Sequence, residues 1–129
     1  APDRAGEARP AMERLRRRAE FLAVAAGARV PASAFVLQAR RRDDAGPARV
    51  GYTVSKKVGT AVERNRVRRR LKEAVRRSAS QHMRCGHDYV IVGRRTALTL
   101  DFERLMGELE QSLVRLHEQR DHGARGLKG

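Results

Sequence analysis

A strongly basic stretch in the middle of the chain has the spacing of an amphipathic helix. Residues 64–77 read RNRVRRRLKEAVRR, with eight Lys or Arg and a single acid, Glu73. The apolar residues of the stretch recur at i, i+4, i+7 and i+8, and they are Val67, Leu71, Ala74 and Val75. This spacing places them on one stripe of a helix that can pack on a core, while the cations point outward. We therefore predict a folded basic surface and not a disordered basic tail.

The charge of the chain is concentrated around this stretch. The formal net charge is +14, and residues 45–100 hold 14 Lys or Arg against three acids, whereas residues 101–118 hold five acids against two Arg. Such a local excess is typical of a surface that binds nucleic acid. Arg66, Arg69 and Arg70 repel one another at helical spacing, and a bound polyanion would offset that repulsion. No apolar run of 18 residues is present, so no membrane partner is predicted.

The residue types in the chain leave two interpretations of the charge open. Arg outnumbers Lys by 25 to 4. The guanidinium group binds phosphate with two donors and stacks on bases, so the bias suits RNA. A genome rich in G and C would produce the same bias.

Cys85 is the single cysteine, so no disulfide forms within the chain and a reducing cytoplasm is the expected compartment.

The start of the basic helix is marked by a capping box. Thr60 and Glu63 have the T-x-x-E spacing in which each side chain bonds the backbone N–H of the other residue. Lys56, Lys57 and Gly59 lie just before it, in the segment SKKVG. A helix N-terminus with nearby lysines attracts phosphate. The alternative is a plain turn from a strand into a helix, and the residues alone leave both open.

The remaining pattern predicts one domain of mixed helices and strands. A helix is expected at residues 12–26, with Leu15, Leu22 and Ala26 near one face, followed by strands at 33–41 and 49–55 that are close enough to form a hairpin. A strand at 88–93 after the basic helix implies a parallel strand–helix–strand unit. An amphipathic helix begins at Phe102. The domain is predicted to span 12–119, with a disordered extension at 1–11 and a flexible tail at 120–129.

Residues suited to chemistry are few. Phe21 and Phe35 offer rings on which unpaired bases could stack, and packing in the core is the alternative for both. His82, Cys85 and His87 form a loose H-x-x-C-x-H, which lacks the fourth ligand that zinc prefers, so no metal site is predicted. No candidate nucleophile, general base or pair of catalytic carboxylates is found. The sequence thus favours a binding protein over a protein that performs chemistry itself.

Residues 51–76, GYTVSKKVGTAVERNRVRRRLKEAVR, resemble the signature of the bacterial ribonuclease P protein subunit family. The family core V-S-K-K-x-G-x-A-V-x-R-N-R-x-(K/R)-R is matched throughout, from Val54 to Arg69. The resemblance covers about Arg14 to Glu118. It implies an α+β fold, a two-layer sandwich in the order αβββαβα, with a mixed sheet and an unusual left-handed βαβ crossover like that of a ribosomal protein domain. The residue pattern alone predicts three strands where the family has four.

The resemblance also implies a function. Members of the family are accessory subunits of an endonuclease that removes the 5′ leader from precursor tRNA in the bacterial cytoplasm. The RNA subunit performs the chemistry with Mg²⁺, and the protein binds no cofactor itself. The expected partners are this catalytic RNA subunit, in a one-to-one complex with a monomeric protein, and precursor tRNA.

The matched positions supply the expected site residues. The set expected to contact the RNA subunit is Arg64, Asn65, Arg66, Arg68 and Arg69, helped by Lys56, Lys57 and Lys72. A cleft for the single-stranded leader is expected to be lined by Phe21, Phe35 and Lys57. Ala25 and Gln38 stand where relatives often have aromatics, which implies weaker or displaced stacking of the leader.

Two other functions stay open from the residues alone. One is a ribosomal protein that binds folded rRNA, and the other is a basic-helix protein that binds DNA. Recognition of a single-stranded leader beside the basic helix would distinguish a ribonuclease P protein subunit from a ribosomal protein. A DNA-binding protein should read sequence in the major groove, and the basic helix lacks the zipper by which the usual basic-region proteins dimerise.

Overall fold

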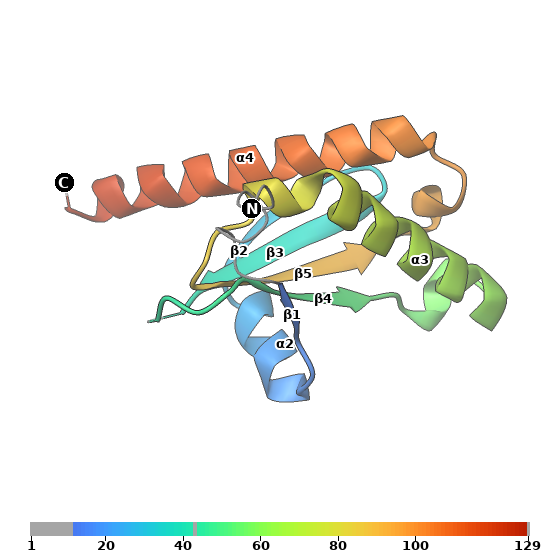
Figure 1. The fold of residues 1–129 in the computed structure, drawn as a ribbon, viewed down its shortest axis with the longest axis horizontal. Coiled ribbons are helices and arrows are strands. Elements are labelled where there is room, and N and C mark those ends of the chain that lie inside the picture. The colour runs from blue at the N-terminus through green and yellow to red at the C-terminus, as the bar shows by residue number, and fades with distance from the viewer. Residues whose placement is uncertain (1–11, 43, 129) are drawn as a thin grey trace, which may run out of the picture.

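The strands of this chain form one mixed sheet with helices on both faces (Figure 1). The structure, a computed structural model, describes residues 12–42 and 44–128, with side chains described as far as Gln119. The elements follow in the order β1 (Glu13–Arg14), α2 (Arg18–Ala25), β2 (Ala28–Pro31), β3 (Phe35–Arg41), β4 (Arg49–Thr53), η1 (Lys56–Val58), α3 (Ala61–Arg77), η2 (Ala79–His82), β5 (His87–Gly93), η3 (Arg95–Leu98) and α4 (Phe102–Lys128). Helices α3 and α4 cover one face of the sheet, and α2 covers part of the other. The predicted α+β class is confirmed.

The order of strands in the sheet is β1-β4-β5-β3-β2, within the described residues. Strands β4 and β5 pair in parallel, which confirms the predicted strand–helix–strand unit around α3. The predicted hairpin between the strands at 33–41 and 49–55 is wrong, because β5 lies between β3 and β4 and pairs with both. A central strand with two partners and two covered faces buries more apolar surface than an isolated hairpin would. The left-handed crossover stays a prediction.

The first predicted helix begins later than expected. Residues 13 and 14 are extended and pair with Arg49 and Val50 of β4, and α2 begins only at Arg18. The Glu20 carboxylate accepts hydrogen bonds from the backbone N–H groups of Arg16 and Arg17, both at 3.0 Å, which fixes that start. The predicted common face of Leu15, Leu22 and Ala26 is also wrong, since Leu15 lies before α2 and is buried, Leu22 is 58% exposed, and Val24 is the buried residue of the helix.

Strand β2 was not predicted from the residue pattern. It has only four residues, ARVP, and it pairs with β3 at the edge of the sheet. Short edge strands that end in Pro carry little alternation, so no period of two marks them. With β2 the structure has the four longer strands that the family resemblance implied, and β1 adds a fifth of two residues.

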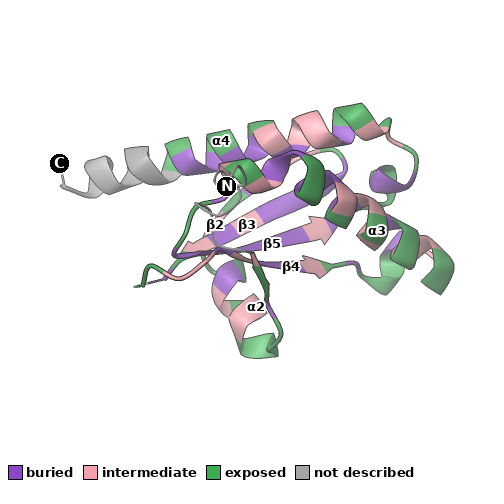
Figure 2. Ribbon diagram, viewed as in Figure 1, coloured by how far each residue is buried: buried purple, intermediate pink, exposed green. Residues whose placement is uncertain are grey.

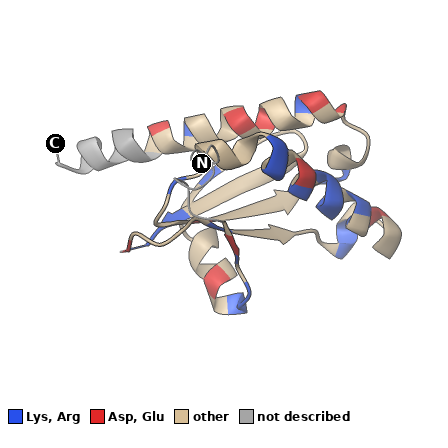
Figure 3. Ribbon diagram, viewed as in Figure 1, with Lys and Arg blue, Asp and Glu red and all other residues tan. Residues whose placement is uncertain are grey.

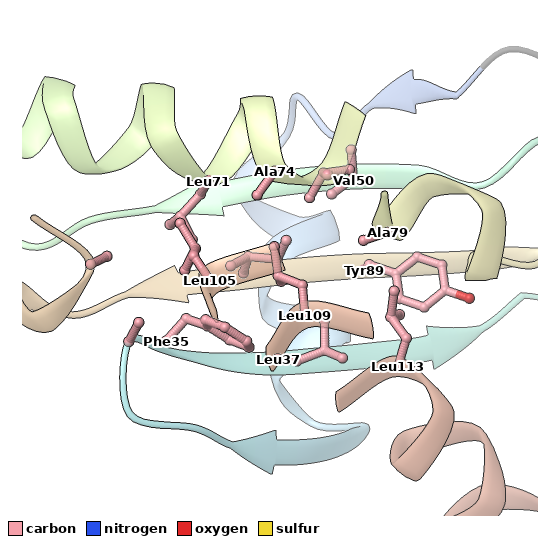
Figure 4. Close-up of a cluster of buried hydrophobic side chains, with 14 of the residues drawn as sticks. Phe35, Leu37, Val50, Leu71, Ala74, Ala79, Tyr89, Leu105, Leu109 and Leu113 are labelled. Atoms are coloured by element: carbon pink, nitrogen blue, oxygen red, sulfur yellow. The ribbon is translucent and has the colours of Figure 1, made fainter. Parts of the chain in front are cut away.

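The core lies between the sheet and the pair α3 and α4 (Figure 4). Alternate residues of β3 and β5 point toward these helices, among them Phe35, Leu37, Tyr89 and Ile91. Helix α4 contributes one buried stripe, as its spacing predicted, and α3 contributes the other (Figure 2). The buried residues of these stripes are Leu105, Leu109, Leu113, Leu116, Val67, Leu71, Ala74 and Val75. Burying both stripes against the sheet fixes the outward face of α3.

Close contact between α3 and the sheet depends on Gly93 at the end of β5. A Cβ added there would lie 2.7 Å from Val67 Cγ1 and 3.1 Å from Leu71 Cδ1, so any side chain would push the helix away. Helix α4 continues to Lys128, through residues for which a flexible tail was predicted. The flexibility of that tail stays a prediction, and the extension predicted at 1–11 lies outside the described residues.

Candidate nucleic-acid interface

The capping box at the start of α3 is confirmed. Thr60 Oγ1 accepts a hydrogen bond from the Glu63 backbone N–H at 3.2 Å, and Glu63 Oε1 accepts one from the Thr60 N–H at 2.9 Å. The two bonds satisfy donors that the first turn of a helix otherwise leaves without partners. The helix therefore begins at a defined residue, which fixes the angle of every later side chain around its axis.

Glu63 also joins α3 to the loop that follows β5. Arg95 donates to both Glu63 carboxylate oxygens, at 3.2 and 3.3 Å, and to the Val58 carbonyl at 2.7 Å. The hydrogen bonds from Arg95 and from the Thr60 backbone hold the pKa of Glu63 below its usual value. Gly59 permits this arrangement, because a Cβ there would lie 2.1 Å from Glu63 Oε1. The Glu63 carboxylate is thus engaged by Arg95 and by the helix start.

Burial of the apolar stripe of α3 turns the rest of the helix toward solvent. Asn65, Arg66, Arg69 and Lys72 are exposed, whereas Arg64 and Arg68 are half-buried. Figure 3 shows cations following α3 along its length, with further cations beside its N-terminal end. All six residues predicted on this helix therefore have surface that a partner can reach.

The cations of α3 differ in how far the protein itself engages them. Arg70 is tied to the fold, because it donates to the carbonyl groups of Ala97 at 2.5 Å and Leu100 at 2.6 Å. Arg76 forms a two-donor ion pair with Glu73, and these hydrogen bonds from Arg76 hold the Glu73 pKa below its usual value. Arg64 donates to the Gly59 carbonyl at 2.9 Å. These three side chains have part of their donor capacity occupied.

Other cations near this face have no such partner. Over the described residues, the cations that form neither a hydrogen bond nor an ion pair on this face include Arg66, Arg69, Lys56 and Lys57. Both lysines are exposed in η1, which directly precedes α3. Lys72 places its Nζ 5.8 Å from the centre of the Tyr52 ring, a cation–π contact that leaves its charge unpaired. Arg66, Arg69, Lys56, Lys57 and Lys72 thus lie around the exposed side of α3 without an acid partner among the described residues.

Asn65 lies within this cationic surface and is oriented by a neighbour. Arg68 Nη1 donates to Asn65 Oδ1 at 3.1 Å, one turn along the helix. The amide oxygen therefore has one of its two acceptor positions engaged, and the NH₂ group of this exposed side chain can donate to a partner. Asn65, Arg68, Arg69, Lys72 and Val62 line a hollow of about 390 Å³ on the helix surface.

The two predicted leader aromatics lie on opposite faces of the sheet. Phe35 is 0% exposed and packs in the core beneath α3 and α4, so its ring has no surface on which a base can stack. Its assignment to the leader cleft is wrong, because residue 35 occupies the face of β3 that the two long helices cover. Lys57 stays a predicted contact of the leader.

Phe21 keeps part of its ring exposed. It is half-buried against Leu15, Val24 and Val90 on the α2 side of the sheet. The ring lies directly over Gly51, where an added Cβ would be 2.5 Å from ring atoms Cε2 and Cζ. Phe21 is therefore partly a packing residue and partly an accessible aromatic surface. Ala25, which ends α2, is exposed, and Gln38 of β3 is half-buried.

A buried ion network holds α2 beside the sheet, and the residue pattern did not reveal it. Asp88 of β5 has no exposed surface and accepts hydrogen bonds from Arg49 at 2.8 Å twice and from Arg42 at 2.6 Å. Arg49 Nη1 also donates to Glu20 Oε2 of α2 at 3.0 Å. Burial raises the pKa of Asp88, but the hydrogen bonds from Arg49 and Arg42 outweigh it, so the pKa lies below its usual value. The network links α2, and with it Phe21, to the central strands.

Two other features are absent from the described part of the chain. No group of three or more His, Cys, Asp or Glu side chains there could hold a metal ion. His87 and His117 instead lie against Tyr89, whose hydroxyl is 2.9 Å from His117 Nε2. No described helix is both long and apolar enough to cross a membrane.

Known proteins resemble this chain over nearly its whole length. A sequence model of the family described as Ribonuclease P matches residues 10–117. The chain is 49% identical over 116 residues to the ribonuclease P protein component of Gluconacetobacter diazotrophicus, covering 89% of this chain and 95% of that relative. It is 42% identical over 112 residues to the protein of the same name from Caulobacter vibrioides, covering 86% and 75%.

The fold is shared with solved structures as well. The RNase P protein from Thermotoga maritima is 30% identical to this chain, with a TM-score of 0.67, and the similarity covers 80% of this chain and 96% of that one. An RNase P protein from Staphylococcus aureus, at 24% identity and a TM-score of 0.62, shows the same fold. These matches agree with the folded basic helix described above. They show that the chain belongs to the ribonuclease P protein family, whose members take part in tRNA processing.

Proposed function

We propose that this chain is the protein subunit of ribonuclease P and that it binds two RNAs. The exposed face of α3, with Lys56 and Lys57, binds the catalytic RNA subunit. The α2 side of the sheet, beginning at Phe21, binds the single-stranded 5′ leader of precursor tRNA. The complex then removes the leader by endonucleolytic cleavage, which matures the 5′ end of the tRNA.

The observation that carries the proposal is the unpaired charge around α3. Arg66, Arg69, Lys56 and Lys57 face solvent without an acid partner among the described residues, while nearby acids such as Glu63 and Glu73 are engaged by Arg95 and Arg76. A protein of this size gains nothing in stability from such crowding of like charges. An RNA backbone would neutralise them and release its own counterions.

The two proposed surfaces lie on opposite sides of the sheet, which suits two different RNAs. The apolar stripe of α3 and the buried ring of Phe35 occupy the helix-covered face, whereas Phe21 and Val90 occupy the other face. An accessible aromatic ring with nearby cations is the usual platform for single-stranded RNA. The protein would thereby bridge the RNA subunit and the leader of the substrate.

The proposal assigns the cleavage chemistry to the RNA subunit with Mg²⁺, as the family resemblance implies. The contribution of this chain is then to neutralise phosphates and to hold the leader. Cations supplied by the protein replace part of the counterion atmosphere that Mg²⁺ otherwise provides, so the complex should need less Mg²⁺. We place the complex in the bacterial cytoplasm with one protein per RNA subunit.

Reconstitution tests this function directly. RNA-free protein, the RNA subunit transcribed from the same genome, and a precursor tRNA are combined while the Mg²⁺ concentration is varied. The protein alone should leave the precursor intact, and the RNA subunit should cut at lower Mg²⁺ when the protein is present. Cleavage at the mature 5′ end by rigorously RNA-free protein would contradict the assignment of chemistry. If adding the protein changes neither the Mg²⁺ requirement nor the substrate affinity of the RNA subunit, the chain is not the protein subunit of ribonuclease P.

A further inference from the structure

The most basic surface of the molecule contains an exposed apolar side chain. Val62, on the first turn of α3, is 75% exposed, more than Leu22 at 58% or Val114 at 45%. A single exposed valine needs no explanation by itself. Its surroundings do, because Val62 forms one wall of the 390 Å³ hollow whose other walls are Asn65, Arg68, Arg69 and Lys72.

Helical spacing explains why these five residues form one surface. Residues 62, 65, 69 and 72 follow one another at intervals of three or four, so their side chains stand in a row along the helix. The long side chains of Arg68, Arg69 and Lys72 extend beyond the short Val62 and Asn65. The hollow therefore has an apolar and amide wall at its N-terminal end, formed by Val62 and Asn65, and its other walls are cationic.

The polar groups of the hollow have distinct roles available to them. Asn65 Oδ1 accepts one hydrogen bond from Arg68, and the amide NH₂ can donate to an acceptor atom of a ligand. Among the described residues Arg69 has no hydrogen-bond or ion-pair partner, and Lys72 has no acid partner and places its Nζ over the Tyr52 ring. An apolar wall, one amide donor and two unpaired cations match the three parts of a nucleotide: the face or edge of the base with its sugar, an acceptor on the base, and the phosphates.

We propose that this hollow binds one unpaired nucleotide of the RNA subunit, with its base or sugar against Val62 and an acceptor of the base on the Asn65 amide. The proposal rests on the function proposed above and specifies what α3 recognises beyond phosphate. An unpaired nucleotide fits this hollow better than a paired one, because the major groove of an RNA duplex is too deep and narrow for side chains to reach its bases and the minor groove is recognised mostly by shape. An unpaired nucleotide in a loop or bulge can turn its base outward.

Serine substitution at Val62 separates this contact from the electrostatic ones. Val62→Ser keeps the charge and nearly the same helix propensity, and the side chain is outside the core, so the melting temperature should not change. Affinity for the RNA subunit should fall about three- to tenfold, because apolar contact with the nucleotide is lost. The slope of log K against log salt should match the parent, since no phosphate contact is removed. Val114→Ser, on α4, is the matched control and should bind as the parent does.

Base removal in the RNA identifies the nucleotide. A pool of RNA subunits with one base missing per molecule is bound to the parent protein, and the weakly bound fraction is sequenced. One unpaired position should be enriched there for the parent protein and should lose this enrichment for Val62→Ser. Parent-like binding by either Val62→Ser or Asn65→Ala, or the absence of any such position, would overturn the proposal.

Charge variants distinguish failure of the nucleotide contact at Val62 from failure of the proposed RNA interface on α3. Arg66→Gln with Arg69→Gln should weaken RNA binding whether or not the hollow holds a nucleotide. Weak binding by this double variant alongside parent-like binding by Val62→Ser rejects only the nucleotide contact. Parent-like binding by all of the variants rejects the RNA interface on α3, and the nucleotide contact with it.

Discussion

At the scale of single residues, Arg66 and Arg70 of α3, about one helix turn apart, differ in the partners that the fold gives them. The sequence groups Arg70 with Arg66 and Arg69 as mutually repelling cations. The structure ties Arg70 to the carbonyl groups of Ala97 and Leu100, whereas Arg66 has no partner among the described residues. Arg70 therefore joins α3 to the loop before α4, and Arg66 is available to RNA.

Paired substitutions at these positions should give opposite results. Arg70→Gln should lower the free energy of unfolding by about 1.5–3 kcal/mol, because two hydrogen bonds from a charged donor are lost. Arg66→Gln should leave it unchanged and instead reduce the salt slope of RNA binding by about one phosphate contact. Urea denaturation and filter binding measure the two quantities. Equal loss of stability in both variants would show that the tether of Arg70 has no special role.

The two phenylalanines offer a second contrast. Phe21→Leu keeps apolar packing on Val24 and Val90 but removes the ring, so affinity for precursor tRNA should fall by about 1 kcal/mol or more, with mature tRNA unaffected. Binding of both tRNAs by the reconstituted complex measures this. Phe35→Leu is the control: it should lower stability and leave the ratio of the two affinities as in the parent. If Phe21→Leu weakens both tRNAs alike, Phe21 only packs.

At the scale of elements, the start of α3 depends on a short cap. Thr60→Ala removes the hydrogen bond to the Glu63 N–H and should lower the free energy of unfolding by about 1 kcal/mol. Thr60→Ser retains the hydroxyl and should restore most of the loss. Thermal unfolding followed by circular dichroism measures both. A serine variant no more stable than the alanine variant would mean that the cap bond contributes nothing.

The attachment of α2 should depend on pH through Asp88. Hydrogen bonds from Arg49 and Arg42 outweigh burial and hold the pKa of Asp88 below its usual value in the folded state. This carboxylate therefore contributes stability above its unfolded pKa of about 3.9, and the contribution is lost as the pH falls through the lower folded pKa. Asp88→Asn should cost about 3–5 kcal/mol near neutral pH, because two guanidinium groups lose their buried partner.

The comparison across pH is the decisive part of that test. Melting temperatures of the parent and Asp88→Asn are measured from pH 7 down to about pH 3. The gap between the two melting temperatures should be constant at the upper end of this range and should begin to narrow below about pH 4, where Asp88 of the unfolded parent chain takes up a proton that the folded chain still excludes. A gap of constant size down to pH 3 would show that the charge of Asp88 does not stabilise the fold.

The same elements show which parts of the fold can be predicted from sequence. Helix α3 was predicted because its cap, Thr60 and Glu63, and its apolar stripe are local patterns. The sheet order was not, since β5 pairs with β3 across some fifty residues and no local period reveals which strands are neighbours. The Asp88 network was missed for the same reason, because Glu20, Arg42 and Arg49 come from three separate segments.

The candidate site likewise has residues that the sequence predicts and features that only the fold reveals. The cations of α3 were predicted individually, but their division into engaged and available groups depends on partners such as Ala97, Leu100 and Arg95, which only the fold brings near. Phe35 was misassigned because its strand is buried by helices far along the chain. The hollow at Val62 was missed because this valine, although part of the matched family core, has no charge or ring to mark it, and only the fold shows that it is exposed. Family membership, not the basic helix, decided between ribonuclease P and the ribosomal or DNA-binding alternatives.

At the scale of the whole molecule, charge and core are separated. The sheet, α3 and α4 bury a single large apolar cluster between them, and α2 covers a smaller one on the other face. The folded body thus holds α3 at a fixed angle with its unpaired cations outward (Figure 3). The proposed RNA-binding surface therefore lies outside the core, and we expect that charge on the exposed face of α3 can be altered without loss of the fold.

The salt dependence of binding to the RNA subunit tests this account most directly. With about five to eight phosphate contacts, the slope of log K against log salt should be about −0.7 to −0.9 per contact for the parent. Arg66→Gln with Arg69→Gln should reduce its magnitude by about two contacts, whereas the exposed α4 pair Arg104→Gln with Arg115→Gln, which removes the same charge, should leave it unchanged. A parent slope near zero, or equal slopes for both double variants, would contradict the claim that the exposed face of α3 binds RNA.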